Sequence, residues 1–101
     1  MKLIYVCSPY SGDINKNVEY ARKACRHVVN SGNIPIAPHL LLPQFMSEET
    51  EREKAMLMNR RILRRCDEVW VFGNNISAGM KSEIEQAEFW KIPILKMEVK
   101  K

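Results

Sequence analysis

Lys2-Leu-Ile-Tyr-Val-Cys-Ser-Pro-Tyr-Ser-Gly-Asp13 opens the chain, and this stretch indicates the architecture. An apolar run begins almost at the first residue, breaks into a turn of small residues and leads into an Asp/Asn cluster. This order is typical of a buried first strand that passes directly into the first helix of an open α/β sheet. In such sheets, ligands bind where the carboxyl ends of strands meet helix N-termini. The opening therefore predicts where a site lies before it predicts a reaction.

The rest of the chain continues this alternation of strand and helix. We expect strands at 2–7, 34–37, 68–72 and 93–99, and helices at 13–31, 50–65 and 80–91. The third strand is almost wholly apolar, which favours a central position covered on both faces, whereas Pro35 favours an edge position for the second. The pattern predicts a single domain over 1–101, a three-layer α/β/α sandwich with a flavodoxin- or Rossmann-like parallel sheet of four to five strands.

Helix periodicity predicts which side chains face the core. In the first helix the apolar stripe contains Val18, Ala21, Cys25, Val28 and Val29. In the second helix Ala55, Met58, Ile62 and Leu63 are expected to point inward.

Local signals predict the helix ends and one long connection. Asp13 or Asn15 is expected to cap the first helix and Gly32 to end it in a left-handed conformation. Thr50 with Glu53 is expected to form a capping box. The segment 38–46 is apolar and bounded by prolines, and we expect a long functional loop there.

Composition limits the class of protein. The chain has 101 residues, of which 46% are hydrophobic and 28% charged, as is ordinary for one globular domain with a modest core. Its apolar runs are too short for a membrane span, and no secretion signal is expected at its start. Three widely spaced cysteines without a CxxC pair predict neither a disulfide framework nor a metal site. A reducing, cytoplasmic location fits these features best.

The net charge of +4 is modest and is concentrated in a few basic residues: Arg60, Arg61, Arg64, Arg65, Lys100 and Lys101. A solvated helix face explains most of it, and a phosphate-bearing ligand or a neighbouring subunit is the alternative. These basic residues do not indicate nucleic acid as a partner, because no aromatic residues are interleaved with them.

The third predicted helix carries a carboxylate on its apolar side. Glu83 shares a face with Met80, Ala87 and Trp90, whereas Glu85 and Glu88 lie on the opposite side. A partly desolvated carboxylate near a helix N-terminus could be a nucleophile or a general base. The alternative is an acidic first-turn residue that only complements the helix dipole.

Two further polar residues lie among apolar ones. Asn59 sits on the inward stripe of its helix, where a buried amide must find a hydrogen-bond partner in the core or on a ligand. Tyr5 lies within the first strand, where a tyrosine is usually part of the core.

Small-residue turns before two helices are candidate anion sites. The first contains Ser8, Pro9, Tyr10, Ser11 and Gly12, and the second contains Ser77 and Gly79. Neither has the GxGxxG or Walker pattern, so each motif is weak on its own. His39 lies in the apolar connection, where a single histidine is more often structural than catalytic.

These segments together resemble the nucleoside 2-deoxyribosyltransferase superfamily. The resemblance covers Ile4–Gly12, Pro38-His39, Cys66–Gly73 and Ser77–Ala87, and it is nearest to the small DUF4406-like members. It implies an enzyme that cleaves or transfers at the N-glycosidic bond of a nucleoside or nucleotide, without a cofactor or a metal. It also implies a homodimer or larger homo-oligomer, for which Met56, Met58 and the 40–46 segment are candidate interface pieces.

The resemblance implies a role for each matching residue. Glu83 matches the nucleophile that attacks C1′ of the sugar, and Tyr5 matches the tyrosine that orients it. Ser77 matches a serine that contacts phosphate in the branch acting on deoxynucleoside 5′-monophosphates, whereas Ser11 replaces the arginine of that branch. Asn59 replaces an aspartate that protonates the leaving base, and an amide cannot supply a proton.

That replacement leaves three alternatives. His39 could protonate the base instead, turnover could be slow, or the protein could only bind a nucleotide or an ADP-ribose-like signal. A small oligomeric interaction module is the remaining, structural interpretation.

Overall fold

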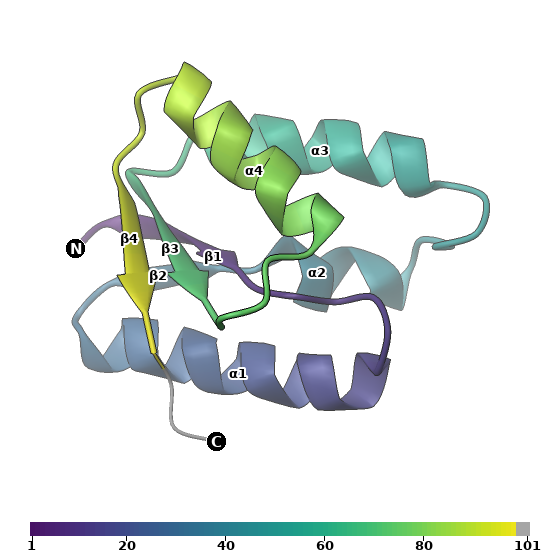
Figure 1. Ribbon diagram of the computed structural model, residues 1–101, viewed down its shortest axis with the longest axis horizontal. Coiled ribbons are helices and arrows are strands. Elements are labelled where there is room, and N and C mark those ends of the chain that lie inside the picture. Colours follow the sequence, from purple (N-terminus) through teal and green to yellow (C-terminus); the bar gives the residue numbers. More distant parts are fainter. Residues whose placement is uncertain (99–101) are drawn as a thin grey trace.

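Four parallel strands form one sheet in the computed structural model, which describes residues 1–98 (Figure 1). The strands are β1 (Leu3–Cys7), β2 (Ile34–Ile36), β3 (Glu68–Phe72) and β4 (Ile94–Met97), in the order β2-β1-β3-β4. β1 and β3 are the inner strands, and β2 lies at an edge, as its proline predicted. The predicted α/β fold class is confirmed.

Alternation along the two inner strands builds a core on each face of the sheet. Ile4 and Val6 of β1 point to one side with Trp70 and Phe72 of β3. Tyr5 and Cys7 point to the other side. Both faces are covered, which is why both strands are nearly continuous apolar runs.

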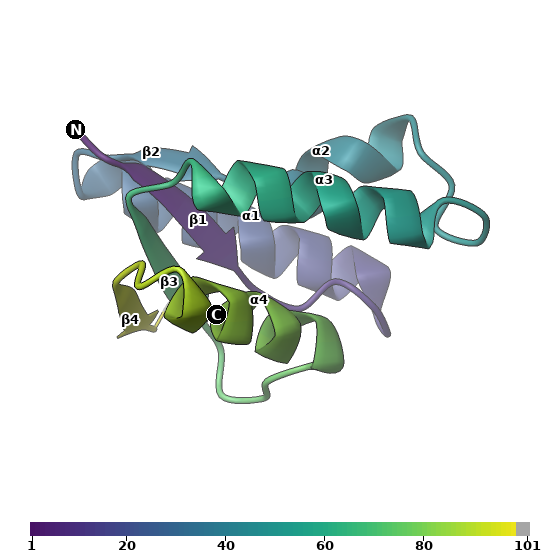
Figure 2. The ribbon, with the colours of Figure 1, turned by 90° about the horizontal axis from the view of Figure 1, so that it is seen from above.

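One long helix covers one face of the sheet, and two others cover the opposite face (Figures 1 and 2). α1 (Ile14–Asn30) packs on the Ile4/Val6 side through Ala24 and Val28. α3 (Arg52–Arg64) and α4 (Ala78–Phe89) pack on the Tyr5/Cys7 side through Leu63, Met80 and Ala87. The predicted three layers are therefore present, with the Tyr5 face turned toward α3 and α4.

The first helix begins and ends as predicted, but its buried face is narrower. The Asp13 side chain accepts a hydrogen bond from Lys16 N, and Gly32 takes a left-handed conformation with φ of +81°. The prediction for Val29 is wrong, because its side chain is 43% exposed and Ala24 is buried instead. Ala21, Ala24 and Val28 lie at i, i+3 and i+7, so Val29 falls one helix step beyond that stripe.

The connection 38–46 is not an irregular loop, so that prediction was wrong. It contains α2 (Pro38–Leu41) and a 3₁₀ turn, η1 (Leu42–Gln44), each with a proline near its start. Proline is well placed there because the first N–H groups of a helix lack partners anyway. Leu42 is buried, whereas Leu41 is exposed.

The predicted capping box of the second long helix is also wrong. No side chain caps α3, which follows Glu51 directly. Instead, the Glu51 carboxylate accepts from Ser47 N at 3.0 Å, and Ser47 Oγ accepts from Thr50 N at 3.4 Å. The contacts of Ser47 with Thr50 and Glu51 thus close the turn before α3 and take the place of the predicted Thr50–Glu53 capping box.

The inward stripe of α3 is narrower than predicted. Leu63 is buried and Ile62 and Ala55 are half-buried, but Met58 is 40% exposed. Asn59 takes the position between Ala55 and Leu63.

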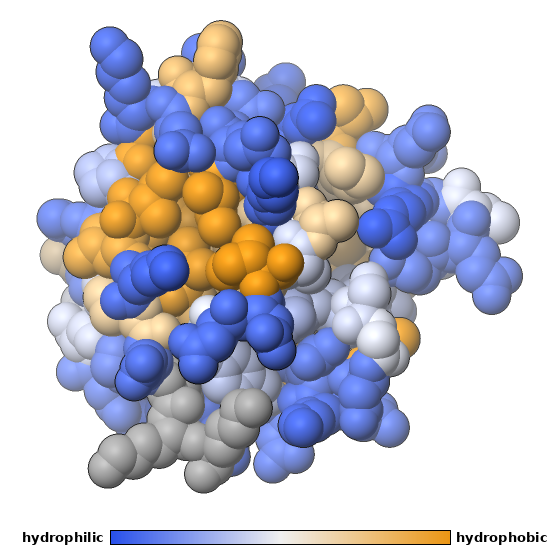
Figure 3. All heavy atoms as spheres, in the orientation of Figure 1, coloured by the Kyte–Doolittle hydropathy of each residue, from blue (hydrophilic) through white to orange (hydrophobic). Residues whose placement is uncertain are grey.

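The last helix and strand are shifted from the predicted bounds. α4 begins two residues early because Ser77 Oγ caps it by accepting from Met80 N at 3.2 Å. β4 ends at Met97, and Val99, the predicted strand end, lies outside the described residues. Half-exposed apolar side chains gather along this edge strand (Figure 3), among them Ile94, Leu95 and Met97.

Among the described residues, no helix is both long enough and apolar enough to cross a membrane.

Candidate functional site

A pocket of about 390 Å³ lies between α3, α4 and the segment after β1. β2 and β3 lie on opposite sides of β1, so the direction in which successive strands are added to the sheet reverses between β1 and β3. Open α/β sheets bind ligands at such a switch point. The pocket has the size of a small-molecule site. Of the predicted site residues, it is lined by Ser8, Tyr10, Ser11, His39, Asn59, Ser77, Gly79 and Glu83.

Glu83 is held at the inner wall by two groups from β1. The Tyr5 hydroxyl donates a hydrogen bond to one carboxylate oxygen, Oε2, and the Cys7 thiol lies 3.5 Å from the other, Oε1. Tyr5 and Cys7 are both buried. The residues are 76 to 78 positions apart in the chain, and the strand's alternation brings both side chains to the α4 face.

The electrostatics of this carboxylate are set by opposing effects. Burial raises the pKa of Glu83, and the hydrogen bonds from Tyr5 and Cys7 lower it. Burial and the nearby Glu83 charge raise the pKa of both Tyr5 and Cys7, so these two remain protonated donors. The arrangement suits a carboxylate that must be ionised, oriented and poorly solvated, as a nucleophile is. Cys7 was not predicted as a site residue, although its alternation with Tyr5 in the first strand is a signal.

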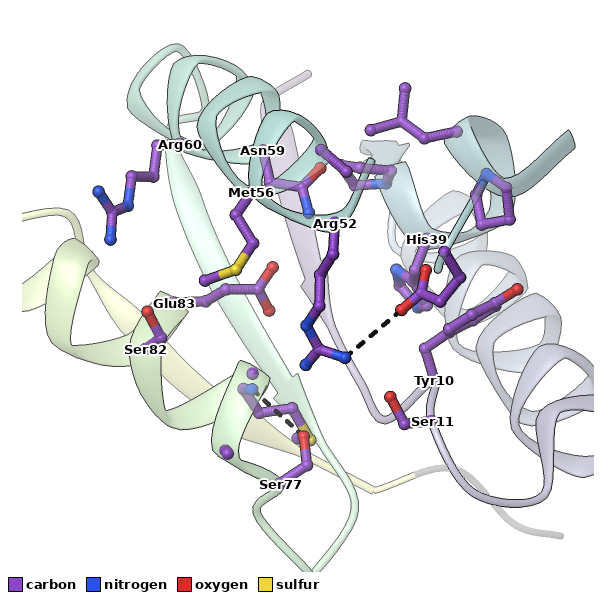
Figure 4. Close-up of a pocket in the computed structure, with 18 of the residues that line it drawn as sticks. Tyr10, Ser11, His39, Arg52, Met56, Asn59, Arg60, Ser77, Ser82 and Glu83 are labelled. Carbon is purple, nitrogen blue, oxygen red and sulfur yellow. Dashed lines mark hydrogen bonds and ion pairs between the residues drawn. The ribbon is translucent and has the colours of Figure 1, made fainter. Parts of the chain in front are cut away.

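Asn59 lies across the pocket on α3. Its Oδ1 atom is buried, and within residues 1–98 no group donates a hydrogen bond to it. Figure 4 shows its amide at the pocket, on the α3 wall that also carries Arg52, Met56 and Arg60. Buried polar atoms are rarely left without a partner, so this oxygen needs an explanation.

His39 forms part of the floor beside the first turn. It shares a hydrogen bond of 2.7 Å between its Nε2 and the Ser8 hydroxyl, and its ring packs edge-on against Tyr10. Burial lowers the pKa of His39 to about 4. At neutral pH the imidazole is therefore almost entirely unprotonated, which argues against its predicted alternative role as the acid that protonates a leaving base.

The turn after β1 is shaped by backbone contacts. The Asn17 amide donates to the carbonyl oxygens of Tyr10 and Ser11 at 3.1 and 2.9 Å. Gly12 has a φ of +97°, which a residue with a side chain rarely adopts. Gly12 and Pro9 shape this turn but do not line the pocket.

The start of α4 forms the opposite lip of the pocket (Figure 4). Ser77 Oγ accepts from Met80 N, which leaves its exposed hydroxyl proton available to a ligand. Gly79 follows in the first helical turn. The N–H groups and dipole of this helix end favour an anion.

Two arginines complete the lining and were missed as site residues. Arg52 extends from the start of α3 across the pocket, where it forms a 3.8 Å ion pair with Glu48 (Figure 4). Arg60 lies two turns later on the same face. The sequence showed the arginine run but not which members face the pocket. Arg60 faces it, whereas Arg64 packs over the ring of Trp90 with its guanidinium 5.4 Å from the ring centre.

Comparison with solved structures places this arrangement in a known fold. The 2-deoxyribosyltransferase of the psychrotolerant bacterium Bacillus psychrosaccharolyticus matches with a TM-score of 0.75 and 18% identity over 95% of this chain and 72% of that protein. The 2-deoxyribosyltransferase of Leishmania mexicana matches with a TM-score of 0.68 and 16% identity, over 97% of this chain and 65% of that one. The protein therefore has the α/β fold of the 2-deoxyribosyltransferases.

The family itself is shown by the sequence. Residues 2–97 match the family described as domain of unknown function DUF7768, and the chain belongs to that family. DUF7768 is distinct from the DUF4406-like group, so a likeness to that group stays a prediction. No curated protein matches the chain.

Proposed function

We propose that this protein cleaves the N-glycosidic bond of a nucleotide, with Glu83 as the nucleophile. The observation that carries the proposal is the pairing of Glu83 with the Tyr5 hydroxyl at the wall of the pocket. Carboxylates in other glycoside-cleaving sites attack the sugar carbon in this way. The fold shared with 2-deoxyribosyltransferases supports a nucleoside or deoxynucleotide substrate.

The reaction would proceed in two displacements. A Glu83 oxygen forms a bond to C1′ while the bond from C1′ to the base nitrogen breaks, and the bonding electrons leave with the base. Water or a second base then attacks C1′, the ester bond to Glu83 breaks, and the carboxylate is regenerated. Water gives hydrolysis, and a second base gives transfer.

A phosphate on the substrate is favoured by the two arginines that line the pocket, whose side chains can donate to it. Arg52, Arg60 and the Ser77 hydroxyl line it together with Ser11. The sequence resemblance left the phosphate without an arginine at position 11, and Arg52 offers a guanidinium from another element. Arginine suits this role because its planar fork can donate two hydrogen bonds to a phosphate. We therefore infer a deoxynucleoside 5′-monophosphate as the substrate class.

The direct test is base release from the four deoxynucleoside 5′-monophosphates, followed by chromatography. The native protein is expected to release a free base from at least one of them. Glu83→Gln is expected to lower that rate by at least about 10³-fold. Glu88→Gln is the matched control, since Glu88 is an exposed carboxylate on the same helix. Absence of release from all four nucleotides, or an equal rate in Glu83→Gln, would contradict the proposal.

A second candidate function is binding without chemistry. Asn59 favours it, because the pocket holds a buried acceptor and no carboxylic acid at that position. In this case nucleotides would raise the melting temperature while releasing no base. Thermal-shift measurements run beside the release assay separate the two functions.

We also propose that the pocket is closed by a second copy of the chain. Met56 lines the pocket and is 39% exposed, and its neighbour in the sequence, Leu57, is exposed as well, as is Phe45, which precedes the lining residue Met46. A domain of this size has little material with which to cover a ligand alone. Mass measurement in solution would give a dimer or larger assembly, and a monomer would contradict this part of the proposal.

A further inference from the structure

The pocket has no evident proton donor on the side where Asn59 lies. The buried Oδ1 of Asn59 accepts no hydrogen bond from residues 1–98, and an amide cannot transfer a proton to a base. In Figure 4 the amide of Asn59 lies on α3, across the pocket from the α4 residues that include Glu83. A leaving base contacted by Asn59 would gain a hydrogen bond but no acid.

The other titratable groups of the pocket do not replace that acid. Glu83 must be ionised to attack, and the hydrogens of Tyr5 and Cys7 are directed at its carboxylate. Burial lowers the pKa of His39 to about 4, so the imidazole that Ser8 contacts is neutral at pH 7 and is a poor acid.

Two further side chains of the lining carry an ionisable oxygen, Glu48 and Tyr10, and both contact other residues. Glu48 lies 3.8 Å from the Arg52 guanidinium. Tyr10 packs against the His39 ring on the segment after β1, rather than beside Asn59 (Figure 4).

Because no pocket group among residues 1–98 can protonate the leaving base, the pocket favours a base that can leave without a proton. A neutral purine or pyrimidine departs as an anion unless it is protonated, and general acid catalysis typically contributes about 10²–10⁴-fold to such steps. A base whose ring nitrogen is already quaternary departs as a neutral molecule and needs no proton. A neutral base therefore needs a proton that this pocket does not supply, whereas a quaternary base does not need one.

We propose that the pocket is selective for nucleotides whose base already carries a positive charge, namely N-glycosyl pyridinium or N7-alkylated purine nucleotides. The unpaired oxygen of Asn59 would accept a hydrogen bond from an amide or amino N–H of such a base. This inference rests on the proposed function, because it assumes that Glu83 attacks the sugar.

The balance of the step is simple. The Glu83 carboxylate bonds to C1′, and the C1′–N bond breaks. Its electron pair neutralises the positive ring nitrogen. Water then cleaves the ester and releases one proton to solvent, with no other co-reactant.

The decisive experiment compares 2′-deoxyguanosine 5′-monophosphate with its 7-methyl derivative, in which one added N-methyl group makes the base cationic. Nicotinamide mononucleotide, a ribonucleotide, is tested separately as a pyridinium substrate. Release measured with Glu83→Gln is subtracted in each case, which removes spontaneous loss of the labile methylated base. For the native protein, kcat/KM for the methylated nucleotide is expected to exceed that for the unmethylated one by at least about 10²-fold.

Asn59→Asp places a carboxyl group, which can donate a proton to the base, at the same position of the pocket. It is expected to raise release from the unmethylated nucleotide by about 10²–10⁴-fold and so to narrow the preference for the methylated one, whereas an unaltered preference in a folded variant would count against the role of the missing acid. The preference of the native protein is measured without any fold-altering substitution at position 59, so the test stands even if that variant does not fold.

The outcomes are distinguishable. Equal Glu83-dependent rates for the two guanine nucleotides would overturn the charged-base inference and leave the proposed function intact. Glu83-independent release, or no release from any nucleotide, would overturn the proposed function and this inference with it.

Discussion

The two walls of the pocket differ in how completely their polar groups are satisfied. The inner wall presents Glu83 on α4, whose carboxylate is held from behind by the Tyr5 hydroxyl and the Cys7 thiol of β1, so all three side chains are paired. The α3 wall consists of Arg52, Met56, Asn59 and Arg60, where Asn59 carries an unpaired buried oxygen and the Arg52 side chain is 60% exposed.

This difference indicates that the inner wall orients the nucleophile, whereas the α3 wall binds the ligand. The inner wall is assembled from the buried core, so its geometry exists before any ligand arrives, as catalytic groups require. The α3 wall has long, exposed side chains and an unused acceptor that a ligand can engage. We infer that the sugar carbon is attacked from the inner wall, and that the α3 wall reads the base and the phosphate.

Beyond the loss of Glu83 itself, the largest expected effect comes from breaking the inner wall at Tyr5. Tyr5→Phe removes the hydroxyl that orients Glu83 and is expected to lower kcat by about 10²-fold. Because that hydrogen bond lowers the Glu83 pKa, the acid limb of the rate–pH profile should also move to higher pH. Tyr20→Phe is the control, since Tyr20 belongs to the opposite core. If the acid limb of the rate–pH profile lies at the same pH in Tyr5→Phe, Tyr5 contributes only packing and does not orient Glu83.

A smaller effect is expected at the α3 wall. Arg52→Ala is expected to lower kcat/KM for a deoxynucleoside 5′-monophosphate by about tenfold, because one charge-assisted hydrogen bond to the phosphate is lost. The matching nucleoside without phosphate should be affected little. Arg61→Ala makes the same charge change on the same helix outside the pocket and should leave both rates in place. Equal losses for nucleoside and nucleotide would remove Arg52 from phosphate recognition.

The smallest effect concerns stability and again probes the inner wall. Since burial raises the Glu83 pKa, its contribution to stability is present below the ordinary glutamate pKa and is lost as the pH rises through the raised value. Glu83→Gln is therefore expected to increase the free energy of unfolding by about 1 kcal/mol at pH 7 and by much less near pH 4.

Urea unfolding at the two pH values measures this difference, with Glu88→Gln as the exposed control. If Glu83→Gln instead destabilises the fold equally at both values, the carboxylate is a structural group rather than a strained functional one.

The fold was largely predictable because its signals are local. Strand β1, strand β3 and the capping of α1 by Asp13 follow from apolar runs and one cap residue, and the structure contains all three. The errors occurred where neighbours compete. The Ser47–Glu51 contacts displaced the predicted Thr50 capping box, and Pro38 began a short helix instead of a loop.

The site was partly predictable for the same reason. The placement of Glu83 on the apolar side of α4 follows from helical periodicity. Arg52 could not be identified as a pocket residue, because nothing in the sequence tells which way a long surface side chain extends.

By itself, the sequence determined the alternation of strands and helices and the faces that its side chains present, because period 2 and period 3.6 are properties of consecutive residues. Only the tertiary structure decided that the Tyr5 hydroxyl meets Glu83 and that the Asn59 oxygen has no donor among residues 1–98. Both facts depend on how strands and helices far apart in the chain pack together, and hydrogen bonding and desolvation depend on that packing rather than on sequence order.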